Sequence, residues 1–188
     1  MVAAFNGGFH LGDDVGGYFY DGQAVKRLRS GLASLDVTTT GQISVGVWDR
    51  TINSTAGMEV VRQNLHPLVW HGSPQASPSD SPDKWGRANG GLRHANRTAL
   101  GQRPDGTVVF AYGYNVQAYE MADALVQAGV QTAVMLDMNK SWPTGFYYEP
   151  SATGKPHGHR ILPMIYRGPD TYFAQFKKDF IVAQAKTS

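Results

Sequence analysis

The chain has 188 residues, of which 41% are hydrophobic and 17% charged, and its formal net charge is +2. This composition excludes a disordered or membrane-embedded protein, and a small net charge without a Lys/Arg run argues against nucleic acid as the main partner. Many glycines and prolines favour a strand-rich fold with many turns, and the absence of cysteine excludes disulfides and thiolate chemistry.

The chain opens on Ala3-Ala4-Phe5-Asn6-Gly7-Gly8-Phe9, a short apolar run that ends on two glycines. This pattern predicts a strand that stops abruptly at a turn. Adjacent glycines permit a positive φ and let a ligand approach the backbone, since no Cβ intervenes. The Asn6 amide would then lie at the lip of a sheet, able to donate and accept. The same run also fits an ordinary hairpin turn, because Asn-Gly is a strong hairpin signal.

Further along the chain, alternating β-prone runs separated by turn residues predict antiparallel hairpins. The segments expected to form them are 16–23, 33–38 with 42–48, and 95–102 with 107–113. The last pair flanks Arg103-Pro104-Asp105-Gly106, where proline presets φ and Asp-Gly closes the turn. A Pro/Ser-rich stretch at 73–82 predicts a surface loop.

Two helices are expected. The first covers about 116–128, because apolar residues recur at helical spacing and Gly129 stands where a C-terminal glycine belongs. The second is an amphipathic helix near 170–183. Between them residues 132–136 are continuously apolar, which predicts a buried strand that ends on Asp137 at a sheet edge. These elements predict a single α+β domain over residues 1–188, with a mixed, largely antiparallel sheet and packed helices.

Two charged residues stand out against apolar surroundings. Arg97 lies in a strand of small and apolar residues, and an inward guanidinium can hold a phosphate or carboxylate through two hydrogen bonds. An outward-facing strand arginine is the alternative. Asp137 directly follows five apolar residues, which fits either a turn cap or a carboxylate with a shifted pKa at a site.

Histidines and tryptophans give weaker signals. His157 and His159 form an H-x-H pair that suits metal binding or proton transfer, but no third ligand stands at a recognisable spacing. His10 follows the opening turn and could reach a ligand bound there. Loop tryptophans such as Trp70 and Trp85 suit either stacking on sugar rings or anchoring of loops in the core.

Three features in this order resemble the phosphodiester glycosidase family, which includes the enzyme that uncovers mannose 6-phosphate. They are Asn-Gly-Gly-Phe at 6–9, Arg-Thr-Ala-Leu-Gly at 97–101 with its Asp-Gly hairpin, and the helix leading into Leu136-Asp137. The resemblance covers about residues 2–142, and the C-terminal loop and helix are similar to actinobacterial members.

The resemblance implies a hydrolase that cleaves the glycosidic bond of a sugar-1-phosphodiester, such as an N-acetylglucosamine phosphodiester, without a metal or other cofactor. It implies that Arg97 clamps the phosphate, Asp137 serves the sugar or the attacking water, Asn6 supplies a hydrogen bond and His10 carries a proton. The remaining residues expected to bind substrate are Gly7, Gly8, Thr98, Asn139, Lys140 and Ser141.

The chain departs from the family in two places. The family commonly has Leu-Asp-Gly-Gly-Gly-Ser where this chain has Leu136-Asp137-Met138-Asn139-Lys140-Ser141, so three glycines are replaced. The added side chains should change the shape of the pocket, and Lys140 brings a positive charge that could face a phosphate. Family members also carry strands upstream of the Asn-Gly-Gly turn, and their absence here indicates a partial or trimmed domain.

Two alternatives follow from the same residues. One is a non-catalytic carbohydrate-binding or cell-wall-binding module on the same fold. The other is a metal-dependent phosphodiesterase that uses His157 and His159. A homodimer that completes the sheet edge is a further hypothesis. No apolar stretch approaches the roughly 18 residues of a membrane span, and we expect a bacterial protein, secreted or in the cell envelope, with its signal outside this sequence.

Overall fold

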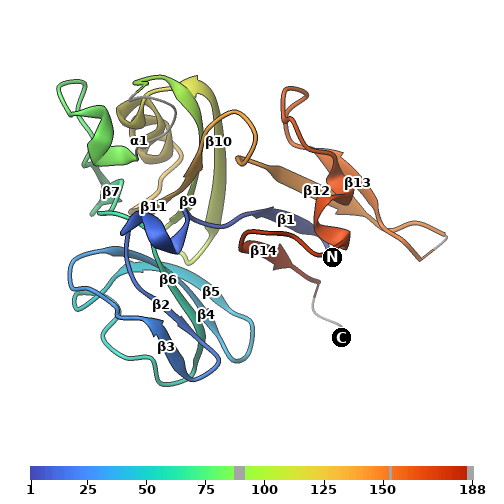
Figure 1. The fold of residues 1–188 in the computed structure, drawn as a ribbon, viewed down its shortest axis with the longest axis horizontal. Helices are drawn as coiled ribbons and strands as arrows, with labels where there is room; N and C mark the ends of the chain where they lie inside the picture. The colour runs from blue at the N-terminus through green and yellow to red at the C-terminus, as the bar shows by residue number, and fades with distance from the viewer. Residues whose placement is uncertain (87–91, 153, 186–188) are drawn as a thin grey trace.

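The structure is a computed structural model that describes residues 1–86, 92–152 and 154–185. Most of its regular structure is β (Figure 1). The strands are β1 (Ala3–Asn6), β2 (Tyr18–Tyr20), β3 (Gln23–Lys26), β4 (Ala33–Thr38), β5 (Ile43–Val47), β6 (Met58–Gln63), β7 (Val69–Trp70), β8 (Ser73–Pro74), β9 (Ala95–Gln102), β10 (Val108–Val116), β11 (Thr132–Met138), β12 (Gly145–Glu149), β13 (His157–Arg160) and β14 (Phe180–Ala183). Within the described residues there is one α-helix, α1 (Ala118–Gln127), and there are 3-10 helices at Leu11–Asp13, Pro82–Trp85 and Pro169–Phe173.

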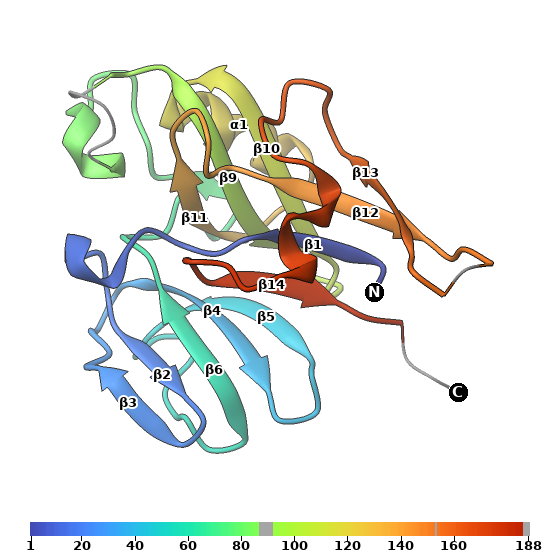
Figure 2. The ribbon, with the colours of Figure 1, turned by 45° about the vertical axis from the view of Figure 1, so that its right-hand side comes forward.

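The strands form three sheets in which every pairing between strands is antiparallel. The strand orders are β13-β12-β1-β14, β10-β9-β11-β7-β8 and β3-β2-β6-β4-β5. The sheet that carries α1 lies on one side of β1, and the β2–β6 sheet lies on the other (Figures 1 and 2). The opening strand therefore runs between the two larger sheets, and its end is close to both.

The expected α+β fold with packed helices is wrong, because the chain is mostly β and its sheets are antiparallel rather than mixed. Within the described residues the one α-helix, α1, packs against β7, β8, β9 and β10. The second expected helix, near 170–183, is also wrong. A 3-10 turn at Pro169–Phe173 and strand β14 take its place.

The apolar spacing near the C-terminus arises from an aromatic cluster rather than from a helix face. The Tyr172 ring stacks on that of Phe180 with centroids 4.4 Å apart and meets that of Phe176 edge-on at 5.3 Å. These four-residue intervals imitate helical periodicity. The β-branched residues Ile181 and Val182 favour a strand, and β14 pairs with β1 along its whole length.

The opening strand β1 ends on Asn6, as expected, but the hairpin interpretation of its turn is wrong. β1 is an inner strand, paired with β12 on one side and β14 on the other. The Asn6-Gly7 step therefore leads out of the sheet instead of back along it. Gly7 and Gly8 are not among the described residues with positive φ. Their role at this turn is instead to let other groups approach the backbone closely, because neither residue has a Cβ.

The predicted hairpins are confirmed, and so is the first helix. β2–β3, β4–β5 and β9–β10 pair as antiparallel hairpins. α1 begins with a capping box, in which the backbone N–H of Gln117 donates to Glu120 Oε2 at 2.7 Å. The apolar run 132–136 lies in β11, and residues 133–136 are buried, as expected for a strand covered on both faces.

Replacing Gly129 by alanine is expected to lower the free energy of unfolding by about 1–2 kcal/mol. Gly129 follows α1 with φ of +80°, a left-handed conformation that a Cβ disfavours. Urea denaturation would measure the change. Gly12→Ala is the control, because a Cβ there meets no atom within 4 Å, and we expect it to alter stability by less than about 0.5 kcal/mol. Equal losses in both variants would contradict the explanation.

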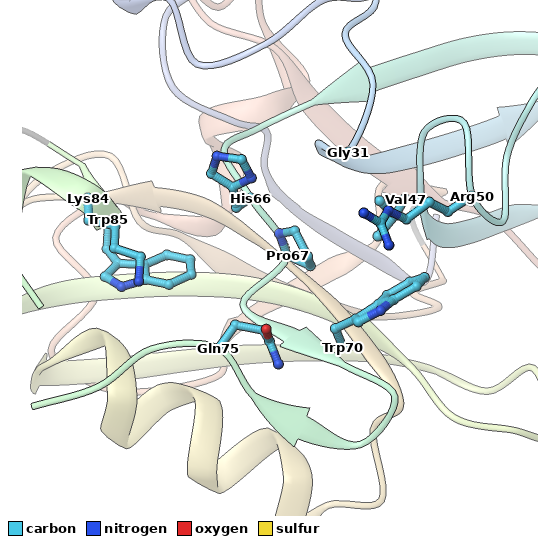
Figure 3. Close-up of a pocket in the computed structure, with 9 residues that line it drawn as sticks. All are labelled: Gly31, Val47, Arg50, His66, Pro67, Trp70, Gln75, Lys84 and Trp85. Atoms are coloured by element: carbon cyan, nitrogen blue, oxygen red, sulfur yellow. The ribbon is translucent and has the colours of Figure 1, made fainter.

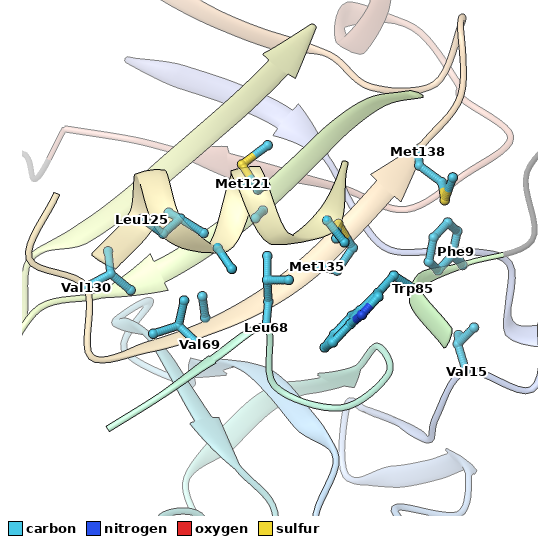
Figure 4. Close-up of a cluster of buried hydrophobic side chains, with 14 residues drawn as sticks. Phe9, Val15, Leu68, Val69, Trp85, Met121, Leu125, Val130, Met135 and Met138 are labelled. Carbon is cyan, nitrogen blue, oxygen red and sulfur yellow. The ribbon is translucent and has the colours of Figure 1, made fainter. Parts of the chain in front are cut away.

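The main hydrophobic core lies between α1 and the β9–β11–β7 sheet. Met121 and Leu125 of α1 face Leu68 and Met135 across this layer (Figure 4). A second cluster, with Phe5 at its centre, joins β1 to the two larger sheets. These two clusters fix the strand ends at which the predicted site residues lie.

Beside the edge strand β14 runs an apolar groove of about 930 Å³, lined among others by Phe5, Phe110 and Ile181. The homodimer expected at a sheet edge remains a prediction. None of the helices in the described ranges combines the length and the apolar character needed to cross a membrane.

Candidate functional site

Three predicted residues, Asn6, Thr98 and Asp137, meet in one buried cluster. Asn6 ends β1, and its Nδ2 donates to Thr98 Oγ1 at 2.8 Å and to the carbonyl of Gly7 at 2.8 Å. Its Oδ1 accepts from the backbone N–H of Thr144 at 2.9 Å. Both ends of the Asn6 amide are therefore bonded within the protein, and Asn6 connects the first sheet to β9.

Thr98 links Asn6 to Asp137. Its Oγ1 accepts from the backbone N–H of Asp137 at 3.2 Å and donates to the backbone carbonyl of Asp137 at 3.2 Å. Thr98 is fully buried. It therefore positions its neighbours and offers no surface to a ligand in this structure.

Asp137 lies near the end of β11, where the pairing with β9 contains a bulge between Met135 and Met138. Bulges of this kind redirect side chains at sheet edges. The carboxylate is 2% exposed. Its Oδ1 accepts from the backbone N–H of Met138 at 2.7 Å, and its Oδ2 accepts from Lys178 Nζ. Burial raises the pKa of Asp137 to about 6, although the Lys178 ammonium acts in the opposite direction.

Lys178 closes the cluster from the segment before β14. Its side chain is 6% exposed, and its ammonium lies 4.9 Å from the centre of the Trp142 ring. A cation is thus held between a carboxylate and an aromatic face. The site beside the Asp137 carboxylate therefore stabilises a positive charge.

The structure does not bring Arg97 to this cluster. The guanidinium is buried, as the inward interpretation requires, but it lies on the other face of β9, because successive side chains of a strand alternate. It donates to the carbonyls of Val116 at 3.1 Å, Trp85 at 3.1 Å and Arg93 at 3.2 Å, and it approaches Met138 Sδ at 3.4 Å. Burial lowers the pKa of Arg97 to about 10, which leaves it protonated at neutral pH.

The glycine turn and His10 lie beside the cluster. Gly7 donates its N–H to the carbonyl of Asp179 at 2.9 Å, and Gly8 donates to Asp179 Oδ2 at 3.4 Å. His10 is exposed and lines a pocket of about 270 Å³, together with Arg62 and Lys178. This pocket is linked to Asp137 through Lys178, which lines the pocket and bonds to the Asp137 carboxylate.

The loop that replaces the family's glycines is a compact turn. Asn139 Oδ1 accepts from the backbone N–H groups of Ser141 and Trp142, each at 2.8 Å. The carbonyl of Ser141 accepts from Arg167 Nε at 3.0 Å. Lys140 is exposed. Asn139 and Ser141 thus have partners within the protein, while the Lys140 side chain extends toward solvent.

His157 and His159 lie on β13, in a different part of the first sheet. Their rings are 4.6 Å apart, the Tyr147 ring stacks on His159 at 4.7 Å, and His159 Nε2 lies 3.4 Å from Glu149 Oε2. In the part of the chain that the structure describes, no group of three or more His, Asp or Glu side chains is arranged to hold a metal ion.

Sequence reasoning missed Arg62, Asn64, Lys178 and Asp179. Asn64 accepts from the backbone N–H of Phe9 at 3.2 Å and donates to the carbonyls of Met135 and Leu136, which ties the glycine turn to β11. The sequence signal that could have identified Lys178 and Asp179 is a group of charged residues next to an apolar strand, Lys177-Lys178-Asp179 before β14.

A separate pocket of about 350 Å³ contains none of the predicted catalytic residues (Figure 3). Its lining includes Arg50, His66 and Trp70 from the segment that runs from β5 to β7, and Trp85 from the 3-10 helix at Pro82–Trp85. Trp85 is almost fully buried and belongs to the main core, which matches its alternative interpretation as a loop anchor. The pocket lined by Lys178 fits the predicted chemistry better, because Lys178 bonds to Asp137.

Comparisons with known proteins bear on the family and the fold of the chain. A family model described as phosphodiester glycosidase matches residues 1–156. Among solved structures, the catalytic domain of zebrafish N-acetylglucosamine-1-phosphodiester alpha-N-acetylglucosaminidase, auto-inhibited by its pro-peptide, has a TM-score of 0.56 and 18% identity to this chain. The likeness, which shows a similar fold, covers 89% of this chain and 60% of the zebrafish chain. No curated protein sequence gives a significant match.

Proposed function

Because the chain belongs to the phosphodiester glycosidase family, we propose that it hydrolyses the glycosidic bond of a sugar-1-phosphodiester. The observation that carries the proposal is the Asp137 carboxylate, which is buried beside the Lys178 ammonium, while the Asp137 backbone is held by Thr98. A carboxylate held in this way at a strand end is typical of a catalytic acid or base. Lys178, which bonds to this carboxylate, also lines the cationic pocket.

In the proposed reaction Asp137 lies at the anomeric centre, where it stabilises developing oxocarbenium charge or activates the attacking water. The leaving group is an anionic phosphate, so the reaction needs little general-acid help. Lys178 supports this assignment, because its ammonium already occupies a place where positive charge is stabilised. Lys178 has to leave that place for a sugar to enter.

The other predicted residues take supporting roles in the proposal. Asn6 and Thr98 hold the Asp137 backbone, and His10 on the pocket wall can carry a proton. Arg97 does not enter the reaction we propose, since its guanidinium is bonded to three carbonyls on the other face of β9.

A second candidate is a carbohydrate-binding module without turnover. The turn formed by Asn139 in place of the family's glycines and the closure of Asp137 by Lys178 favour it. The metal-dependent alternative has less support, because His157 and His159 lack a third ligand among the described residues.

Assays on p-nitrophenyl and UDP-linked N-acetylglucosamine phosphodiesters, with and without a chelator, test the proposal. Free sugar released in the presence of chelator supports a glycosidase. Binding without turnover supports the module, and chelator-sensitive release of sugar phosphate supports the metal enzyme. Either of the last two results would contradict the proposed reaction.

Turnover is expected to rise with pH through about 6, because the proposed role of Asp137 requires the ionised carboxylate. In Lys178→Met the ammonium that lowers this pKa is absent, so the acidic limb of kcat/KM should move to higher pH. A profile between about pH 4 and pH 8 measures it. Lys155→Met is the control, since Lys155 is an exposed lysine that pairs with Asp170 at 3.0 Å. Identical limbs in the two variants would contradict the assignment.

A further inference from the structure

The Asp179 carboxylate occupies the glycine turn that the sequence assigned to a ligand. Its Oδ2 accepts from Arg62 Nε at 3.1 Å and from the backbone N–H of Gly8 at 3.4 Å. A Cβ built on Gly7 would collide with this carboxylate. An anionic group of the chain itself therefore makes the close approach that two adjacent glycines permit.

The Arg62 side chain is buried beside the glycine turn. Its side chain is 5% exposed, and two of its other N–H groups donate to the carbonyls of Gln63 and Phe9. An arginine has five N–H donors, so among the described residues two are left for a ligand. A guanidinium and a backbone N–H that converge on one oxygen form a donor set that suits phosphate as well as carboxylate.

The pocket beside Asp179 is cationic. Arg62, Lys177 and Lys178 line its volume of about 270 Å³, and Asp179 is the one carboxylate among its lining residues. Lys178 reaches from this pocket to Asp137. Two consecutive residues therefore carry opposite charges into the site. The Lys178 ammonium pairs with Asp137, and the Asp179 carboxylate pairs with Arg62.

This charge pattern matches that of a sugar-1-phosphate at the point of cleavage, with positive charge at the sugar and negative charge at the phosphate. We propose that Arg62, the Gly8 N–H and Lys177 form the phosphate subsite, and that Asp179 fills it in this structure as a competing anion. The inference rests on the proposed function, because it assigns the phosphate of that substrate. It assigns to Arg62 the phosphate-binding role that the resemblance implied for Arg97.

Binding of inorganic phosphate to the full chain, measured by isothermal titration calorimetry, tests the subsite. In Asp179→Asn the competing charge is gone, and phosphate should bind at least about tenfold more tightly than to the wild type. Adding Arg62→Gln should remove that gain. If the Arg62 variant does not fold, Lys177→Gln in the Asp179→Asn background should weaken binding by about threefold.

Asp170→Asn is the matched control. Asp170 is an exposed carboxylate of the same C-terminal region, paired with Lys155 at 3.0 Å, and its loss should leave phosphate affinity unchanged. Unchanged affinity in Asp179→Asn, or an equal gain in Asp170→Asn, would overturn the subsite.

The proposed reaction is tested separately, because phosphate binding does not need Asp137. If the affinities change as expected while no variant releases sugar, the subsite stands and the proposed hydrolysis fails. If sugar is released but neither phosphate affinity nor KM responds to Asp179→Asn, the hydrolysis stands and the subsite is wrong.

Discussion

The Asp137→Asn variant is expected to release free sugar at least about 1,000-fold more slowly than the wild type. An amide keeps the shape of the side chain and can still accept from the backbone N–H of Met138. It carries no negative charge to stabilise an oxocarbenium ion and is a poor base. Lys178 loses its counterion but lines the adjoining pocket, so it can turn toward solvent and the fold should persist.

The matched control is Asp36→Asn. Asp36 is also a buried aspartate, and burial raises its pKa to about 7. It lies on β4, where Ser44 Oγ donates to it at 3.3 Å, and in the part of the chain that the structure describes it shares no hydrogen bond with Asn6, Thr98 or Asp137. We expect turnover within about threefold of the wild type in this variant. Near-normal turnover in Asp137→Asn, or equal losses in both variants, would refute the role of Asp137.

Features set by local chemistry could be predicted from the sequence. The β9–β10 hairpin follows from Arg103-Pro104-Asp105-Gly106, and α1 follows from its apolar spacing and Gly129. The buried strand before Asp137 follows from five consecutive apolar residues. In each case, neighbouring residues decide the backbone conformation, so no knowledge of the rest of the chain is needed.

Contacts between distant segments could not be predicted in the same way. Asn6 bonds to Thr98 across 92 residues, and Lys178 bonds to Asp137 across 41. Both contacts depend on the order of strands and on the bulge in β11, which a pattern of residue types does not reveal. The resemblance implied that Asn6, Arg97 and Asp137 serve one site, but Arg97 lies apart from the other two. It gave no indication that Lys178-Asp179 would close the site.

Arg97 shows the same limit on a single strand. The sequence indicates that a charged residue lies among apolar ones, but a one-residue change in register would move it to the other face. Thr98 takes the face toward Asn6 and Asp137, so Arg97 faces Trp85 and Met138. The sequence left open whether the Arg97 side chain points inward or outward, and it did not indicate which carbonyls the guanidinium would bind.

Replacing Arg97 by alanine is expected to lower the free energy of unfolding by about 3–5 kcal/mol. The guanidinium is 1% exposed and satisfies three carbonyls, which would lose their donor next to a new cavity. Arg97→Lys should lose about 1–3 kcal/mol, since an ammonium cannot reproduce the planar arrangement of donors. Denaturation by urea, monitored by tryptophan fluorescence, measures both changes.

Arg103→Ala is the control for loss of an arginine as such. Arg103 is an exposed residue of the β9–β10 turn that donates to one carbonyl, that of Ala128, at 2.7 Å, and its removal should cost less than about 1 kcal/mol. Phosphate affinity per folded molecule should stay the same in Arg97→Lys, because Arg97 faces away from the Arg62 pocket. Unchanged stability together with weakened phosphate binding in Arg97→Lys would instead assign the phosphate to Arg97, and the subsite at Arg62 would be wrong.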